Sequence, residues 1–113
     1  MSGSRSRSKG KRGERELAAA LTAEGFDARR GAQHRGGPDS PDVLCPSLPA
    51  IHFEAKRCER LSLYDAVGQA KREAGDKLPV VAHRRNRHEW LAILPLADLL
   101  AVVRESEFVE PDR

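Results

Sequence analysis

Three side chains, Asp42, Glu54 and Lys56, fall at a spacing that can bring them together. A proline-flanked turn at residues 46–50 lies midway between the two acidic residues, with a short apolar segment on either side. If these segments pair as an antiparallel hairpin, Asp42 lies opposite Glu54, with Cβ atoms roughly 5 Å apart. Side chains at positions i and i+2 of a strand share a face, so Lys56 joins Glu54. The hairpin therefore predicts two carboxylates and an ammonium group on one surface.

These residue types predict metal-dependent hydrolysis of phosphodiester bonds. Adjacent carboxylates repel each other unless a cation lies between them, and a hard ion such as Mg²⁺ prefers oxygen ligands. Such an ion polarises a phosphoryl oxygen and lowers the pKa of a bound water. Lys56 beside the attacking water or the phosphate would stabilise developing negative charge. A protein that only binds DNA has no use for paired carboxylates, because they repel a polyanion.

Glu14 is a further acidic residue with an inward-facing position. It precedes Leu17 by three residues in a helix predicted for residues 13–24, so it shares the apolar face. There it could hold a metal-bound water or the lysine ammonium group. The alternative is that Glu14 only favours the helix N-terminus through the helix dipole. Glu16 is rotated by about 200° around the helix and is predicted to face solvent.

Periodicity and turn residues predict a mixed α/β layer in which helices cover a sheet, in the order α-β-β-β-α-β-β-α. The first helix ends at Gly25, a second begins with a capping box at Ser62 and ends at Gly75, and a third starts at Pro95. Strands are expected at residues 26–30, 43–45, 51–55, 78–82 and 90–94. The inward apolar residues of the second and third helices are predicted to be Leu63, Val67, Ala70, Ala74, Leu96, Leu99, Leu100 and Val103.

Length and composition favour one compact soluble domain. The chain has 113 residues, of which 39% are apolar and 33% charged. It contains no apolar run that could span a bilayer and no secretory signal, so we expect a cytoplasmic protein. Residues 13–104 are expected to form the domain and residues 105–113 an acidic tail.

The N-terminal residues 1–12 contain five basic residues and no acidic one. They are predicted to form a flexible tail that binds phosphate backbones through counterion release. A solubilising leader is the alternative. Among the other polar residues, Cys45 and Cys58 are expected to be reduced thiols. The four histidines show no metal-ligand spacing, although His52 shares the strand face of Glu54.

Pro41-Asp42, followed by Glu54-Ala55-Lys56, resembles the PD-(D/E)xK nuclease signature. Residues 9–17 and 25–30 resemble archaeal-type Holliday-junction resolvases and related phage-encoded nucleases, and the similarity covers residues 8–83. The order of the features along the chain is more specific than the short signature. A glutamate-bearing helix comes first, followed by Pro-Asp, Glu-x-Lys and a glutamine-bearing helix. The resemblance implies a restriction-endonuclease-like fold, with a mixed central β-sheet flanked by helices.

The resemblance also implies roles for individual residues. Lys56 would be the catalytic lysine, and Gln69 would lie near the active site, a solvated helix face being the alternative. One or two Mg²⁺ ions, which Mn²⁺ can replace, would be held by Glu14, Asp42, Glu54 and the carbonyl oxygen of Ala55. The implied function is that of a homodimeric resolvase that nicks two strands of a four-way junction in DNA recombination and repair. The alternatives are a flap, nick or duplex endonuclease, or a non-catalytic DNA-binding module on the same fold.

Several basic residues are candidates for DNA contacts. Arg15 and Arg30 match positions in the family that contact DNA or support the site. Arg35 lies in the glycine- and proline-rich loop of residues 31–41, which can reach DNA. Solvated loop and turn residues are the alternative interpretation. A further DNA-facing patch is predicted from Lys71, Arg84 and Arg85.

Overall fold

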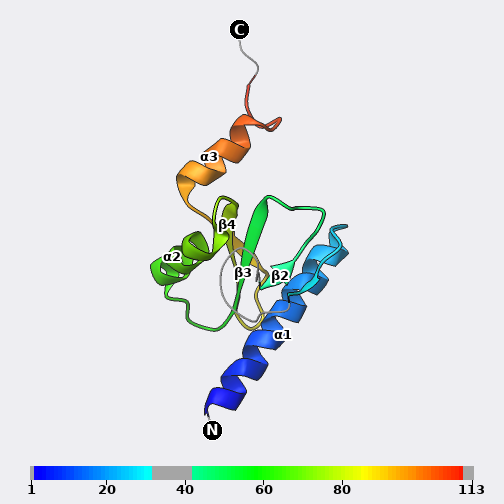
Figure 1. Ribbon diagram of the computed structural model, residues 1–113, viewed down its shortest axis with the longest axis vertical. Coiled ribbons are helices and arrows are strands. Elements are labelled where there is room, and N and C mark those ends of the chain that lie inside the picture. Colours follow the sequence, from blue (N-terminus) through cyan, green and yellow to red (C-terminus); the bar gives the residue numbers. More distant parts are fainter. Residues whose placement is uncertain (1, 32–41, 111–113) are drawn as a thin grey trace.

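The computed structural model describes residues 2–31 and 42–110, with side chains from residue 10 onward. Figure 1 shows a sheet between helices, which confirms the predicted α/β class and element order. The elements are α1 (Ser2–Ala23), β1 (Arg29–Arg30), β2 (Val43–Leu44), β3 (Ile51–Arg57), α2 (Leu63–Ala74), β4 (Leu78–Arg84), β5 (Leu91–Ile93) and α3 (Leu96–Arg104). None of these helices is both long and apolar enough to cross a membrane.

The five strands form one mixed sheet in the order β1-β2-β3-β4-β5. Only β3 and β4 run parallel, and α2 makes the crossover between them. Strands β2 and β3 form the predicted hairpin, and Val43 pairs with Phe53. This pairing confirms the predicted register, in which Asp42 lies opposite Glu54. Strand β1 is shorter than predicted, whereas β3 and β4 are longer because their ladder continues to the Arg57–Arg84 pair.

Helices α1 and α2 cover opposite faces of the sheet. Odd-numbered residues of β3, such as Phe53, pack toward α1, and even-numbered residues such as Glu54 point toward α2. The core on the α1 face contains Leu17, Ala18, Val43, Cys45, Phe53, Val80 and Ala82, with Trp90 packed against it. The core on the α2 face contains Ala66, Ala70 and Val81. Cys45 and Cys58 are both free thiols.

Helix α1 begins at Ser2, within the segment predicted as a basic tail, so the prediction of a helix starting near residue 13 was wrong. Arginine and lysine are good helix formers, and the chain contains no proline before residue 38. Once the second half of the helix packs on the sheet, each further turn needs no new nucleation. The basic residues thus extend an existing helix.

Helix α2 is rotated relative to its predicted seam. Its buried residues are Ala66, Ala70 and Ala74, whereas Leu63, predicted to face inward, is 42% exposed. Alanine side chains are small, so alanines at this spacing let the axis of α2 approach the sheet closely. The polar residues of α2 at the edge of this buried helix face then lie over β3.

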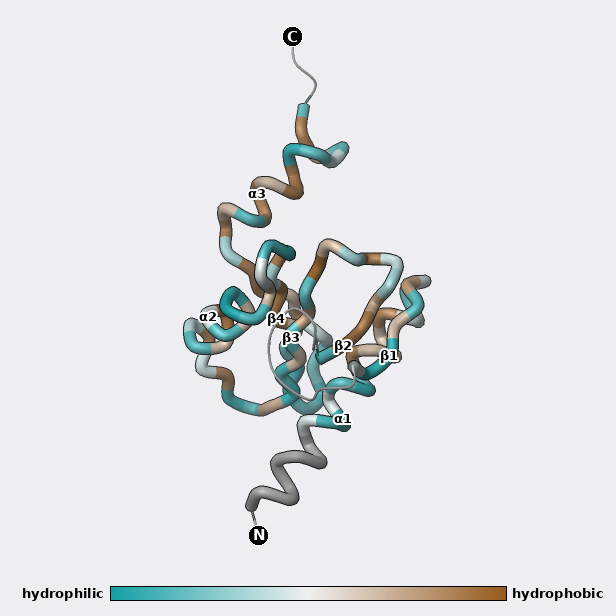
Figure 2. Tube along the Cα trace, viewed as in Figure 1, coloured by the Kyte–Doolittle hydropathy of each residue, from teal (hydrophilic) through white to brown (hydrophobic). Residues whose placement is uncertain are grey.

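Helix α3 stands away from the sheet in Figure 1, and Figure 2 shows apolar residues along it. The prediction that its leucines face inward was wrong, because the helix has no buried residue and Leu96 is 70% exposed. The amphipathic pattern correctly predicts a helix, but no surface in the described part of the chain covers it.

Candidate active site

Strand β3 carries the polar residues of the site on the face that looks toward α2. Glu54 is 2% exposed and His52 is 1% exposed, whereas the Lys56 side chain is 28% exposed and reaches solvent. The Lys56 Nζ lies 4.0 Å from Glu54 Oε2 and donates a hydrogen bond to Gln69 Oε1 at 2.9 Å. The structure therefore brings Gln69, on α2, to the lysine rather than leaving it on a solvated face.

Asp42 sits at the start of β2 and is held against β3. The backbone N–H of Ala55 donates to Asp42 Oδ2 at 3.0 Å, and the N–H of Gly31 donates to the Asp42 carbonyl oxygen at 2.9 Å. The Asp42 side chain is buried and lies within hydrogen-bonding reach of Glu54. The hairpin thus brings Asp42, Glu54 and Lys56 to one surface, the juxtaposition that the sequence predicts.

The buried carboxylates perturb one another. Burial, followed by the charge of Asp42 and the hydrogen bonds that protonated Glu54 donates to Asp42 and Glu73, raises the pKa of Glu54 to about 10. Glu54 consequently holds a proton at neutral pH when no cation is present. A divalent cation between these oxygens would remove the repulsion, so the residues fit an oxygen-liganded metal ion.

Glu14 approaches Asp42 from the α1 side of the sheet. It is buried, and Arg30 Nε donates to its Oε1 at 2.8 Å. Burial raises the pKa of Glu14, the charge of Asp42 raises it further, and Arg30 acts in the opposite direction. The Arg30 guanidinium group is thus paired with Glu14.

Sequence reasoning placed His52 on the strand face of Glu54 but missed Glu73. His52, Glu54 and Glu73 each offer a ligand atom, and these three atoms lie within 4.8 Å of one another. Burial lowers the pKa of His52. Glu73 accepts a hydrogen bond from Gln69 Nε2 at 3.5 Å. Its spacing of four residues from Gln69, which puts both on one helix face, was the available signal.

A second cluster ties α1 to the far end of the sheet. Glu16 Oε1 accepts hydrogen bonds from Arg57 Nε and from Arg84 Nη1, each at 3.0 Å. The prediction that Glu16 faces solvent was wrong, because the parallel ladder places two arginines side by side beneath α1. Arg84, predicted to face DNA, is held by this ion pair. Gly13 allows the close approach, since a Cβ there would lie 2.6 Å from the Arg57 Cβ.

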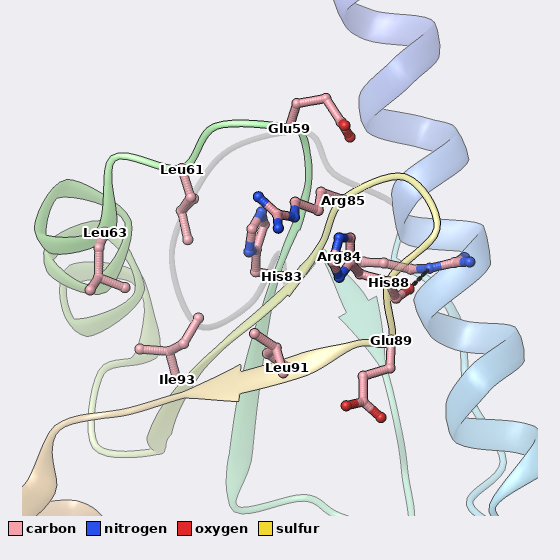
Figure 3. Close-up of a pocket in the computed structure, with 10 residues that line it drawn as sticks. All are labelled: Glu59, Leu61, Leu63, His83, Arg84, Arg85, His88, Glu89, Leu91 and Ile93. Carbon is pink, nitrogen blue, oxygen red and sulfur yellow. Dashed lines mark hydrogen bonds between the residues drawn. The ribbon is translucent and has the colours of Figure 1, made fainter.

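The remaining basic candidates among the described residues lie on the surface. Arg15, Lys71 and Arg85 are exposed, and Arg35 lies outside the described residues. Arg85 also lines a cavity of about 530 Å³ beside β4 and β5, together with His83, Leu91 and Ile93 (Figure 3). Neither Asp42 nor Glu54 lines this cavity, so it is separate from the carboxylate site.

The mixed sheet between helices, with two crowded carboxylates and a lysine at one hairpin, is the arrangement typical of the PD-(D/E)xK class. The chain matches the family model of the archaeal Holliday junction resolvase (hjc) over residues 5–109, and it belongs to this family. The match extends beyond residues 8–83, the part of the chain whose motifs resemble the family. Searches of curated proteins and of solved structures gave no match.

Proposed function

We propose that this chain is a Mg²⁺-dependent endodeoxyribonuclease that resolves four-way DNA junctions, with Mn²⁺ able to replace Mg²⁺. The observation that carries the proposal is the meeting of Asp42 and Glu54 beside the Lys56 ammonium group. Membership of the resolvase family supports the choice of a branched DNA substrate. The domain of residues 13–104 would carry the activity.

The cation would be held by Asp42 and Glu54, with Glu14 and the carbonyl oxygen of Ala55 as the further ligands that the family resemblance implies. When bound, such an ion polarises a phosphoryl oxygen and makes a water more acidic. Burial of both carboxylates strengthens their attraction for a cation, because there is little solvent to screen it. The Arg30 contact keeps Glu14 oriented toward Asp42.

Lys56 supplies the positive charge that the reaction needs at the phosphate. Gln69 accepts a hydrogen bond from one of the three N–H groups of Lys56. This contact fixes the ammonium group and leaves the other N–H groups for a phosphate oxygen. A preorganised charge of this kind stabilises the negative charge that develops as a phosphodiester is attacked. Gln69 is a positioning residue in this scheme, since it acts through Lys56.

DNA would be held by the exposed basic residues Arg15, Lys71 and Arg85, with Arg35 as a further candidate. Their contacts would go to phosphates and would be weakened by salt. Arg30 and Arg84 would contribute less, because each is paired with a glutamate.

We also propose that the protein acts as a homodimer in the cytoplasm of a bacterial, archaeal or phage-infected cell, in DNA recombination and repair. Symmetric cutting of a junction needs two active sites related by a twofold axis. The exposed leucines of α3 offer an apolar surface that a second copy would cover.

A cleavage assay tests the activity with labelled four-way junction, flap, nicked duplex and single-stranded DNA, each with Mg²⁺ or EDTA. We expect EDTA-sensitive cutting that prefers the junction. Equal rates on all substrates would contradict junction resolution, and a preference for flaps or nicks would support the related endonuclease. Binding of the junction without any cutting would support a non-catalytic module.

Substitutions identify the residues that carry the activity. Glu54→Gln and Lys56→Ala should each lower the cleavage rate about 10²-fold or more, because each removes charge from the reacting centre. Junction binding and the circular dichroism spectrum should change little. Glu24→Gln, at the exposed end of α1, is the matched control and should cut normally.

A further inference from the structure

We propose that the cavity beside β4 and β5 receives helix α3 from a second copy of this chain, so that two copies exchange their last helices. The inference rests on the proposed function, because it requires the homodimer proposed there. It adds the surface of each copy that accepts α3, which lies outside the carboxylate site. The lining of the cavity, the direction of α3 and the charges beside both surfaces support it.

The cavity presents apolar side chains to solvent. It has a volume of about 530 Å³, and its apolar lining residues are Leu61, Leu63, Leu91 and Ile93 (Figure 3). Leu91 is 54% exposed, although it lies on a strand of the central sheet. Leu61 and Ile93 also pack against the core on the α2 face. An apolar occupant of the cavity would therefore extend this core.

The exposed apolar residues are concentrated rather than scattered. Apart from Phe26 and Tyr64, the large apolar residues exposed in the described part of the chain lie in the cavity, on α3 or shortly after it: Leu63, Leu91, Leu96, Leu99, Leu100, Val102, Phe108 and Val109. Single exposed apolar residues need no explanation, whereas contiguous apolar surfaces mark interaction sites. The leucines of α3 are spaced by three and four residues, so they share one helix face.

The link between β5 and α3 directs the helix away from its own cavity. Leu94 precedes a proline, which disfavours the helical backbone conformation at that residue. Pro95 itself is extended, with φ −59° and ψ 140°. The chain therefore continues outward from β5, and α3 stands away from the sheet (Figure 1). A helix projected in this way is available to the cavity of another copy.

Opposite charges accompany the two apolar surfaces. The β4–β5 turn at the rim of the cavity, residues 83–88, contains three arginines and no acidic residue. Residues 105–110, which follow α3, contain three glutamates and no basic residue. The cavity lining also includes Glu59 and Glu89, so the attraction comes from the turn rather than from the whole cavity. Complementary charges of this kind select a partner and fix its register.

A twofold axis makes the exchange reciprocal. Each copy donates one helix and fills one cavity, so every contact occurs twice and the nine residues of α3 contribute two helix faces to the interface. Asp42, Glu54 and Lys56 do not line the cavity, so an occupant there leaves these residues free for DNA.

Disulfide formation between chosen positions of the full chain tests the exchange. Cys58→Ser removes the more accessible native thiol, since Cys45 is buried. In this background, isotope-labelled chains with Leu91→Cys are equilibrated with unlabelled chains with Leu99→Cys and oxidised with glutathione disulfide. We expect a covalent dimer in which mass spectrometry finds the cavity position of one chain joined to the α3 position of the other. Chains with Glu24→Cys, at the exposed end of α1, in place of Leu99→Cys should give no such dimer.

A chain that carries both Leu91→Cys and Leu99→Cys distinguishes the possible occupants. A disulfide within one chain would overturn the inference, because α3 would then cover its own cavity. Failure of the labelled and unlabelled chains to become joined would overturn it as well.

Sedimentation equilibrium gives an independent measurement. Leu91→Asp should raise the dimer dissociation constant about 100-fold or more, because it places a charge at both symmetry-related contacts. Tyr64→Asp, at an exposed side chain that does not line the cavity, should leave the constant unchanged. Circular dichroism establishes whether Leu91→Asp folds, and if it does not, the disulfide experiment decides.

A monomeric wild-type chain, or an unchanged dimer in folded Leu91→Asp, would overturn the inference. Either result leaves the nuclease proposal standing, because cleavage of a junction with Mg²⁺ tests the enzyme separately.

Discussion

In the metal-free protein a proton occupies Glu54, and a cation must displace it. Because burial and the charge of Asp42 raise the pKa of Glu54 to about 10, its carboxyl group is protonated at neutral pH. Ionising it at pH 7 costs about 4 kcal/mol, since the pKa lies about three units higher. This competition weakens Mg²⁺ binding about 1000-fold at pH 7 and about 100-fold at pH 8. The affinity for Mg²⁺ should therefore rise about tenfold with each pH unit in this range.

Isothermal titration calorimetry with MgCl₂ at pH 7, 8 and 9 measures this dependence. At each pH two buffers of different protonation enthalpy report how many protons leave, and we expect about one per chain. Glu54→Gln should remove both the proton release and the pH dependence, because the amide does not titrate. Glu24→Gln should behave as the wild-type protein.

An affinity for Mg²⁺ that stays constant from pH 7 to 9, with no proton released, would refute this reasoning. Glu54 would then already be ionised in the metal-free protein. Burial beside Asp42 and Glu73 would not control its protonation, and the proposed fit between the crowded carboxylates and a cation would lose its electrostatic basis.

Three further predictions concern folding and assembly. Because the folded-state pKa of Glu54 lies above its ordinary value of 4.5, the folded metal-free protein binds more protons than the unfolded chain. Its unfolding free energy should fall by up to about 1.4 kcal/mol per pH unit between pH 6 and 9 in urea titrations, and this slope should be lost in Glu54→Gln. Gly13→Ala should lower stability in thermal melts by roughly 1–3 kcal/mol through its clash with Arg57, whereas Gly10→Ala, which meets no atom within 4 Å, should not destabilise the helix. Leu100→Glu should convert a dimer to monomers in sedimentation velocity, and an unchanged sedimentation coefficient would exclude α3 from the interface.

The hairpin and its acidic residues could be predicted from sequence because local rules determine them. A proline-rich turn centred on residue 48 leaves one register that buries Phe53, and that register aligns Asp42 with Glu54. Alternation along a strand then places Lys56. Each step depends on neighbours in the chain or on one strand pair.

Contacts between distant elements could not be predicted in this way. Glu16 meets Arg84 only because β3 and β4 are parallel neighbours beneath α1, and periodicity along one helix contains no information about that pairing. Glu73 reaches Glu54 because α2 packs through its alanines rather than through Leu63. Helix α3 shows the same limit, since an apolar stripe predicts a helix but not the surface that will cover it.

The two border strands, β1 and β5, contain only two and three residues. Rows of open backbone N–H and C=O groups this short are poor templates for adding a strand from another chain. The sheet is therefore protected against edge-to-edge stacking into fibrils, a common hazard for proteins with long flat borders. A dimer that forms through helix side chains therefore leaves no long strand edge to which further chains could add.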